Sequence, residues 1–378
     1  MKNVLKLSVF NKKLLEHKGL TLEGLGEKCG VSKEAVSKWL SGRSMPTDDK
    51  LMRLCVALNV DRSRILEVGD ADPGNEPICH YRTKLAEPLN RETQERTERF
   101  ARFMRRFSER NYRKSFLQFP ILANPVRNYK FIQRVASDFR SMFGVGVIPS
   151  ADDLIGCFSK FHIHLLPVFW GGKDYQGNAL RIFLPSLNLT WVMLNIDSRL
   201  CDFKFWMAHE LGHTLLPKTA GDFAEKFADS FAQALLYPQE FAEASYDVIR
   251  SRGDPISVCR SEAKRCGLSA YTIYRAILDY QTANPAKDKA FRASQRMAEA
   301  CLCADPKDTV SKFLFGPKGE SVEGYLKLAG NYFKSDFFTV LRAFARECGS
   351  MSYVGDLGLL LGLSYPDAYA IVQTLKKK

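Results

Sequence analysis

The sequence predicts a helix-rich α+β protein with an N-terminal domain of short helices, a middle domain containing one small sheet, and a helical C-terminal region. The chain has 378 residues, and at roughly 100–200 residues per domain this length favours two or three domains. Short apolar or alternating runs at 162–169, 180–184 and 189–194 have the length and composition of strands. Most other segments are helical in pattern, and a charged fraction of 26% excludes wholesale disorder.

Charge and cysteine content narrow the class of protein. Lys and Arg number 55 against 42 Asp and Glu, a formal net charge of +13 that favours a polyanionic partner. No window approaches about 18 uncharged apolar residues, so we expect no transmembrane helix. The apolar run near the start is short and is broken by Lys6, so we expect no signal peptide and a cytoplasmic protein. The ten cysteines include no CxxC pair, which predicts reduced thiols and no cysteine zinc site.

Residues 1–68 are predicted to form short helices separated by turn signals. Gly30 can supply a left-handed turn residue, and Ser32 can then cap a helix. Val36 and Leu40 share one face of that helix and are expected to point to the core. The opposite surface would meet bases and phosphates if the helix lay in a DNA major groove. The side chains on that surface are Lys33, Ser37 and Lys38.

This segment resembles the XRE-type helix-turn-helix over about residues 9–66, through the stretches LTLEGLGEKCGVSKEAVSKW, LSGRSMP and LMRLCVALNV. The resemblance implies a five-helix domain over 1–68 that binds double-stranded operator DNA, usually as a homodimer on a palindrome. One departure is Gly26, where the pattern usually has alanine. Gly26 and Gly24 are each expected to cost the helix about 1 kcal/mol relative to alanine. The groove-facing positions that the resemblance implies are Ser32, Lys33, Ser37 and Lys38.

Residues 69–115 are predicted to be a linker followed by a basic amphipathic helix. The linker, 69–90, contains three prolines and no sustained periodic pattern of apolar residues. The helix, 91–114, carries nine basic and four acidic residues, a net +5. Its apolar residues recur at helical spacing and form one stripe: Phe100, Phe103, Met104 and Phe107. Two interpretations stay open: a solvated helix that docks this stripe, or the same helix with arginines that also contact the DNA backbone.

The middle domain, 116–285, is predicted to place helices at 131–143 and 151–160 before the three strands. Further helices are predicted at 202–216 and 222–236. Residues 286–378 resemble no family and are predicted to be a helical domain of unknown role.

The helix predicted at 202–216 contains the sequence HELGH. His209 and His213 are four residues apart, so they lie one turn apart on one face and can share a metal ion. Glu210 is rotated by about 100° from His209 and is placed to take a proton from an attacking water. Two imidazoles leave a catalytic zinc site one protein ligand short, so we expect a carboxylate from a neighbouring helix.

The helix predicted at 222–236 offers such a carboxylate. Glu225 and Asp229 share one face of an otherwise apolar helix, and an acidic pair near a core needs a chemical reason. Metal ligation by Glu225, with Asp229 holding a histidine Nδ1–H, is such a reason. His162 and His164 are expected to alternate on a strand and to support the sheet rather than the metal. Tyr237 is considered as an oxyanion donor, with packing as the favoured interpretation.

The segments FWMAHELGH and EKFADSFAQALLYP, preceded by TWVMLN, resemble the ImmA/IrrE family of metallopeptidases over roughly 116–285. The resemblance implies a zincin-like core that holds Zn2+, with Mn2+ as an alternative. Family members cut protein substrates, often repressors of the XRE class, and so release stress, mobile-element or phage-defence genes. The resemblance assigns His209, His213 and Glu225 as metal ligands, Glu210 as general base and Asp229 as the partner of a ligand histidine.

Three functions fit these motifs. The first is a DNA-binding transcription regulator with a zinc endopeptidase domain that cleaves a repressor, a partner regulator or itself. The second is a non-catalytic repressor whose zincin-like domain senses a ligand or holds a partner. The third is the peptidase toxin of a toxin–antitoxin or phage-defence system. The presence of Glu210 favours an intact catalytic set over a pure sensor.

The glycine-turn-serine signal that precedes the DNA-facing helix occurs twice more in the chain. The two copies are Gly267-Leu268-Ser269 and Gly362-Leu363-Ser364. Neither following helix is strongly basic in its first two turns, so both copies are predicted to be structural packing units.

Overall fold

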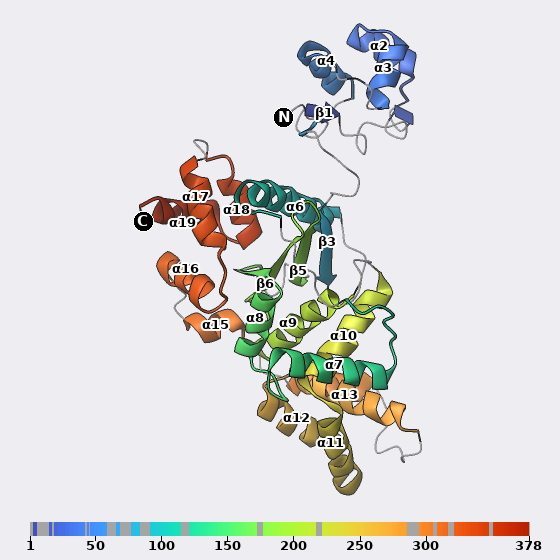
Figure 1. Cartoon of the computed structure of the whole chain (residues 1–378), viewed down its shortest axis with the longest axis vertical. Helices are drawn as coiled ribbons and strands as arrows, with labels where there is room; N and C mark the ends of the chain where they lie inside the picture. The colour runs from blue at the N-terminus through green and yellow to red at the C-terminus, as the bar shows by residue number, and fades with distance from the viewer. Residues whose placement is uncertain are drawn as a thin grey trace. The chain divides into compact units, whose positions relative to one another are not determined.

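The computed structural model describes residues 3–5, 15–16, 19–41, 44, 46–58, 66–68, 77–83, 91–114, 121–171, 177–216, 221–285, 295–304, 308–316, 321–347 and 351–377. The chain divides into two compact units, residues 1–76 and 77–378 (Figure 1). The described part contains seventeen helices and a small four-stranded sheet, so the predicted helix-rich α+β class is confirmed. No helix in the described ranges is long and apolar enough to cross a membrane.

Within its described residues, the N-terminal unit packs three short helices around a small core. These helices are α2 (Leu22–Cys29), α3 (Lys33–Leu40) and α4 (Asp48–Leu58). Leu25, Val36 and Leu54 are fully buried among them. The predicted count of five helices falls partly on residues outside the described ranges.

A two-stranded ribbon accompanies these helices. Strand β1 (Asn3–Leu5) pairs antiparallel with β2 (Leu66–Val68), with Asn3 opposite Val68. The prediction of helices alone over 1–68 is therefore wrong at these six residues. The pairing joins the two ends of the segment, and no local pattern encodes such a contact.

The second unit is organised around a sheet with the strand order β3-β5-β6-β4. Strand β5 pairs antiparallel with both β3 and β6, and β4 runs parallel to β6 (Figure 1). Three of the strands confirm the predicted runs. Strand β3 lies inside the segment predicted to be a linker, so that prediction is wrong at this strand. The strands are β3 (Ile78–Thr83), β4 (Ile163–Val168), β5 (Gly177–Leu184) and β6 (Leu189–Asn195).

One face of this sheet packs on the larger helical layer. Leu165, Ala179, Val192 and Leu194 point into that core. The predicted helices at 131–143, 151–160, 202–216 and 222–236 are confirmed there within a few residues. The helices of this layer are α7 (Tyr129–Phe143), α8 (Ala151–Lys160), α9 (Leu200–Thr214), α10 (Asp222–Leu236), α11 (Gln239–Arg252), α12 (Pro255–Cys266), α13 (Ala270–Ala283) and α14 (Gln295–Ala304).

The opposite face of the sheet packs on the basic helix and on the C-terminal helices. Leu166, Leu180, Trp191 and Met193 point to this side, as expected from the alternation of strand side chains. The C-terminal helices therefore share their core with the sheet instead of forming a separate one. The helices of this layer are α6 (Arg91–Asn111), α16 (Val322–Asn331), α17 (Phe337–Glu347), α18 (Val354–Leu361) and α19 (Tyr365–Lys377).

Residues 308–311 fasten the C-terminal region to the start of α9. This segment leads into α15 (Val310–Phe315). The Ser311 amide donates to the Ile196 carbonyl at 2.7 Å, and the Leu200 amide donates to the Asp308 carbonyl at 2.8 Å. The loop between β6 and α9 is thus held from the C-terminal side.

Candidate functional site

The turn between α2 and α3 has the conformation that the sequence predicts. Gly30 ends α2 with φ = 65°, and Ser32 Oγ accepts from the Ala35 amide at 3.3 Å to cap α3. The Val31 amide donates to the Gly26 carbonyl at 2.9 Å and closes the turn. A Cβ at Gly26 would lie 2.7 Å from the Val31 carbonyl oxygen. An alanine at this position would therefore force the turn to shift, which opposes the expected gain from helix propensity.

The side chains predicted to face DNA all lie on the exposed surface of α3 or its cap. Val36 is fully buried and Trp39 is 4% exposed, whereas Leu40 is only partly buried. Trp39 is the core residue that the prediction missed. Lys33 forms an exposed ion pair with Glu23 at 3.1 Å. The four predicted DNA-facing residues are Ser32, Lys33, Ser37 and Lys38.

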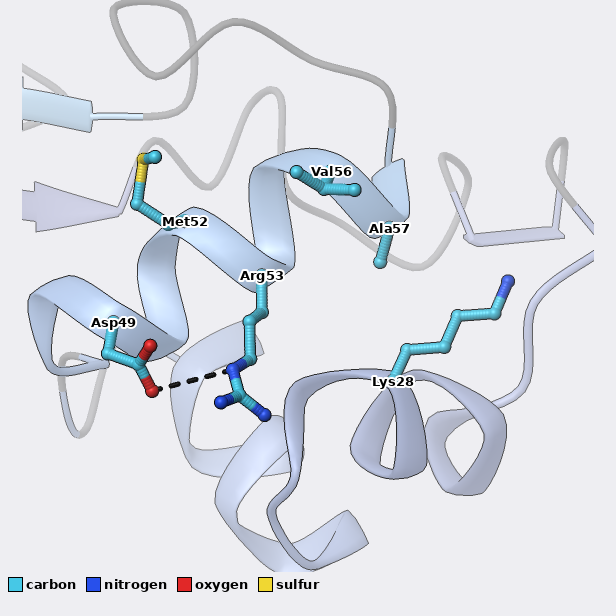
Figure 2. A pocket seen from close by; sticks show the side chains of 6 residues that line it. All are labelled: Lys28, Asp49, Met52, Arg53, Val56 and Ala57. Carbon is cyan, nitrogen blue, oxygen red and sulfur yellow. Dashed lines mark ion pairs between the residues drawn. The ribbon is translucent and has the colours of Figure 1, made fainter.

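A cavity of about 490 Å³ lies beside α4 in the same unit (Figure 2). Its lining combines an ion pair between Arg53 and Asp49 at 3.4 Å with the exposed side chains of Met52 and Val56. Val56 is 79% exposed, which leaves an apolar surface on α4.

Helices α9 and α10 bring three candidate metal ligands together. His209 and His213 of α9 have their Nε2 atoms 3.0 Å apart. The Glu225 carboxylate of α10 lies 3.4 Å from each of these nitrogens, through one oxygen to each ring. One donor atom from each of the three side chains lies within 4.8 Å of the other two.

This donor set fits a tetrahedral zinc ion. Zinc bonds to histidine nitrogen and carboxylate oxygen are about 2.0–2.2 Å long, so tetrahedral ligand atoms are about 3.3 Å apart. The two Nε2 atoms are 3.0 Å apart, and each lies 3.4 Å from one Glu225 oxygen. Both histidine side chains are at most 4% exposed, whereas that of Glu225 is 42% exposed. The cluster is therefore buried on the histidine side and open on the side of α10.

The protonation of the cluster suits a cation. Burial lowers the pKa of His213 to about 4, against the opposing hydrogen bond with Glu225, so the ring is neutral near pH 7. Burial also favours the neutral form of Glu225, but hydrogen bonds with His209 and His213 outweigh it and lower the pKa of Glu225 below its usual range. Neutral imidazole and carboxylate are the forms that bind metals.

Asp229 lies where the sequence predicted it. Its Oδ1 is 3.0 Å from His209 Nδ1, on the opposite side of the ring from the cluster. A carboxylate at Nδ1 fixes the tautomer with a proton on Nδ1 and leaves Nε2 as the metal-binding lone pair.

Glu210 follows His209 on α9 and is only 3% exposed. Arg181, on the strand face that packs against α9, is a neighbour that the sequence prediction missed. Burial lowers the pKa of the Arg181 guanidinium, and the charge of Glu210 raises it. Arg181 also lowers the pKa of His213, so its charge reaches one of the candidate metal ligands as well as Glu210. The only sequence signal for Arg181 is a single charge inside the apolar strand LRIFL.

The close contact between α9 and α10 depends on Gly212, inside the HELGH sequence. A Cβ at Gly212 would lie 3.0 Å from Ala228 Cα and 3.1 Å from the Phe231 ring. The absence of a side chain therefore lets α10 approach closely enough to carry Glu225 to the two histidines.

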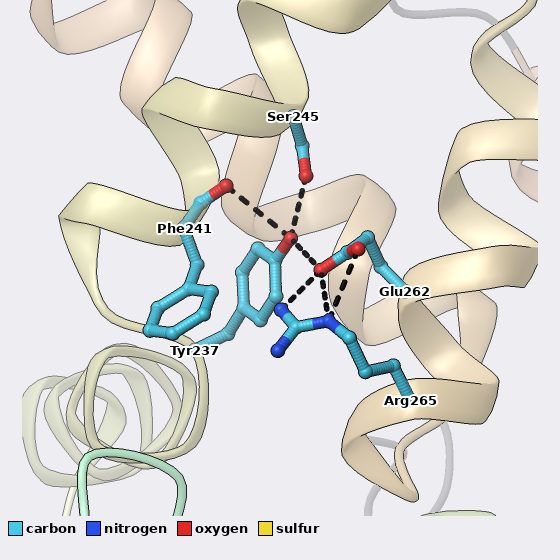
Figure 3. Close-up of polar contacts among 5 residues, drawn as sticks. All are labelled: Tyr237, Phe241, Ser245, Glu262 and Arg265. Atoms are coloured by element: carbon cyan, nitrogen blue, oxygen red, sulfur yellow. Dashed lines mark hydrogen bonds and ion pairs between the residues drawn. The ribbon is translucent and has the colours of Figure 1, made fainter.

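The hydroxyl of Tyr237 takes part in a polar network away from these ligands (Figure 3). It lies 2.6 Å from Ser245 Oγ and 3.0 Å from Glu262 Oε2, and Arg265 in turn pairs with Glu262. This network ties the end of α10 to α11 and α12, which agrees with the packing interpretation of Tyr237.

His162 and His164 were predicted to share one face of a strand, and the structure places them differently. His162 precedes β4 with φ = 50° and so does not share a strand face with His164. His164 Nδ1 lies 2.8 Å from Asp336 Oδ1 on the other side of the sheet from α9. This contact joins β4 to the segment before α17.

Comparison with known proteins identifies the N-terminal segment. No curated protein and no solved structure matches the chain. A helix-turn-helix family model matches residues 12–65, which contain α2, α3 and α4. Residues 12–65 therefore form a helix-turn-helix of the XRE type, the DNA-binding domain of a transcription regulator.

Proposed function

We propose that the chain is a DNA-tethered metallopeptidase, in which the helix-turn-helix binds an operator and the cluster between α9 and α10 cleaves a protein substrate. The observation that carries the proposal is the convergence of His209, His213 and Glu225 within 4.8 Å, beside the buried Glu210. The substrate is a repressor or a partner regulator. These assignments rest on the donor geometry and on the motif resemblance.

The chemistry follows from the side chains of the cluster. A bound zinc ion would polarise the scissile carbonyl and lower the pKa of a water molecule. Glu210 accepts the proton of the attacking water and delivers it to the leaving amine. Asp229 holds His209 in the tautomer that keeps its Nε2 free of a proton. Mn2+ is an alternative ion, because a site of two histidines and one carboxylate also accepts it.

The presence of a base favours catalysis over ligand sensing. A sensor would need the ligands His209, His213 and Glu225 but not an acid next to them. Burying a carboxylate such as Glu210 costs folding free energy unless partners compensate it. Arg181 supplies a compensating charge in this protein, and metal binding alone would need neither of these two side chains.

The proposal includes a homodimer on a two-fold DNA site. Met52 and Val56 on α4 are 55% and 79% exposed and give the N-terminal unit an apolar surface for a second copy. Two copies would present two α3 helices to successive major grooves.

The decisive experiment uses Glu210→Gln with elemental analysis of the purified full chain. We expect wild type and Glu210→Gln to retain equal zinc, because the amide leaves the three ligands in place. Cleavage of fluorescein-labelled casein should fall by about 100-fold or more, as expected for loss of a general base. Glu240→Gln, a change of an exposed acid on α11, is the control and should match wild type. Equal cleavage by Glu210→Gln and wild type would refute the assignment of the base, and absence of zinc from both would refute the metal site.

A further inference from the structure

Three corners of the chain share one local geometry. In each, a small residue on the first helix is followed four residues later by a glycine with positive φ and six residues later by a capping serine. The amide before the serine donates to the carbonyl of the small residue at 2.9, 3.0 and 2.8 Å, in chain order. The three sets are Gly26, Gly30 and Ser32; Ala263, Gly267 and Ser269; and Gly358, Gly362 and Ser364.

The third corner, between α18 and α19, reproduces the packing of the DNA-binding corner. A Cβ at Gly358 would lie 3.1 Å from the Leu363 carbonyl oxygen, at the position where a Cβ on Gly26 would lie 2.7 Å from the Val31 carbonyl oxygen. Ala368 and Ile371 are buried at the positions that correspond to Val36 and Trp39. The helix pair therefore has the form of the helix-turn-helix at 12–65.

The three corners differ in how much of the second helix is buried by neighbouring helices. In the middle corner, the first and fifth residues of α13 are Ala270 and Tyr274, and both are at most 3% exposed beneath other helices. In the third corner, the same positions of α19 are Tyr365 and Tyr369, which are 55% and 42% exposed. Lys33 and Ser37 occupy these positions in the DNA-binding corner. The prediction of a purely structural role thus suits the middle copy but leaves an open face on the third.

The two exposed tyrosines form a surface that can contact DNA. Their rings are stacked with centroids 6.4 Å apart and planes 20° apart. Tyrosine hydroxyls bind phosphate oxygens, and aromatic rings pack on thymine methyl groups in the major groove. Asp367, the acid between them, is turned back to Ser364, with its carboxylate 2.5 Å from the serine hydroxyl at the start of α19.

Arginines of α6 flank the start of α18, where the first helix of such a corner crosses the DNA backbone (Figure 1). Arg99 pairs with Asp356 of α18 at 2.5 Å, and Arg106 lies 3.8 Å from the same carboxylate. The Arg106 side chain is 70% exposed and that of Arg102 is 56% exposed. Arg102 lies 3.8 Å from Glu98, so both exposed arginines are held only by long ion pairs on the surface and can turn to phosphates.

We propose that α18 and α19, together with the arginine face of α6, form a second binding site for double-stranded DNA. Helix α19 lies in the major groove with Tyr365 and Tyr369 against the base edges, and Arg102 and Arg106 contact phosphates. This site is separate from the peptidase cluster and stands whether or not the chain is an enzyme.

The test measures binding to a random-sequence 30-base-pair duplex by fluorescence anisotropy over a series of salt concentrations. Every protein is full length and carries Lys33→Glu and Lys38→Glu, which disable the N-terminal site. We expect this background to retain salt-dependent binding. Adding Tyr365→Ala and Tyr369→Ala should weaken that binding about tenfold. Adding Arg106→Ala should lower the slope of log affinity against log salt by about 1.

Matched controls use exposed residues elsewhere in the second unit. Phe313→Ala on α15 removes an aromatic side chain that is 70% exposed, and Arg252→Ala removes an exposed arginine at the end of α11. Both should leave binding unchanged. Loss of all duplex binding in the background protein would overturn the proposal. Residual binding that ignores the tyrosines would overturn it as well, and so would tyrosine variants that change only the oligomeric state, which would indicate a protein-binding surface.

Discussion

At the scale of single residues, Gly212 determines how closely the two halves of the metal cluster approach. Gly212→Val would place methyl groups against Ala228 and Phe231, where even a Cβ is only 3.0 Å from Ala228 Cα. Helix α10 must then move away and take Glu225 from the histidines. We expect zinc affinity to fall at least about tenfold, in the range seen when the supports of a metal site are lost.

The measurement for Gly212 is zinc retention during dialysis against a weak chelator. Gly156→Ala in α8 is the matched control, because an added Cβ there meets nothing within 4 Å. That control should retain zinc as wild type does and gain about 1 kcal/mol of stability or less from higher helix propensity. Equal zinc retention by Gly212→Val and wild type would contradict this account of the site.

A second prediction at this scale concerns Gly26→Ala. We expect it to lower stability, whereas helix propensity alone predicts an increase. Gly26→Ala should lower the stability of the N-terminal unit, because its Cβ would lie 2.7 Å from the Val31 carbonyl oxygen. Propensity alone would raise that stability by about 1 kcal/mol. The midpoint of the first thermal transition of the full chain, compared between wild type and Gly26→Ala, decides between the two; an upward shift would show that the turn can relax.

The metal-site residues could be chosen from the sequence for a simple reason. On a helix, spacing alone decides which side chains share a face, so the sequence pairs His209 with His213 and Glu225 with Asp229. Arg181 could not be found in this way. Its position near Glu210 depends on sheet register and on how α9 packs against β5, and both are set by contacts between distant parts of the chain.

At the scale of elements, the basic helix α6 docks by its aromatic stripe, as the first of its two interpretations predicted. Phe107 is fully buried, and its ring contacts those of Trp191, Phe337 and Phe344. We expect Phe107→Ala to cost about 3–5 kcal/mol of unfolding free energy. Met142→Ala, at a side chain that is 62% exposed, should change it little.

Chemical denaturation of the two variants, compared with wild type, checks the docking of α6. A cost below about 1 kcal/mol for Phe107→Ala would mean that the helix packs loosely on the sheet. Helices such as α8 and strands such as β4 and β6 could be predicted because their periodicity is local. Strand β3 could not, because residues 78–83 become a strand only when β5 offers them an edge.

At the scale of the whole molecule, the helix-turn-helix and the candidate metal ligands belong to separate compact units. Lys33→Ala together with Lys38→Ala removes two exposed cations from α3. We expect the preference for operator over random-sequence DNA to be lost, because specific recognition depends on those contacts, while the zinc content stays at the wild-type level. Gel-shift assays and elemental analysis of the same preparation measure both properties.

The matched control for the lysine pair is Lys327→Ala together with Lys264→Ala, at positions outside the helix-turn-helix. The control should bind the operator like wild type. If the lysine double variant kept full operator affinity, residues outside α3 would have to recognise the operator sequence. The family match covers 12–65, and the boundaries predicted at 115 and 285 remain predictions.

The hydrogen bonds between residues 308–311 and the start of α9 have a practical consequence for the design of truncated fragments. A fragment ending at residue 285 would strip the hydrogen-bond partner from the Ile196 carbonyl, just before the metal-binding helix. It would also leave Leu180 and Trp191 without the C-terminal helices that cover their face of the sheet. Such a fragment would aggregate on expression, so a truncation that isolates the second unit should begin at residue 77 and keep the whole remainder.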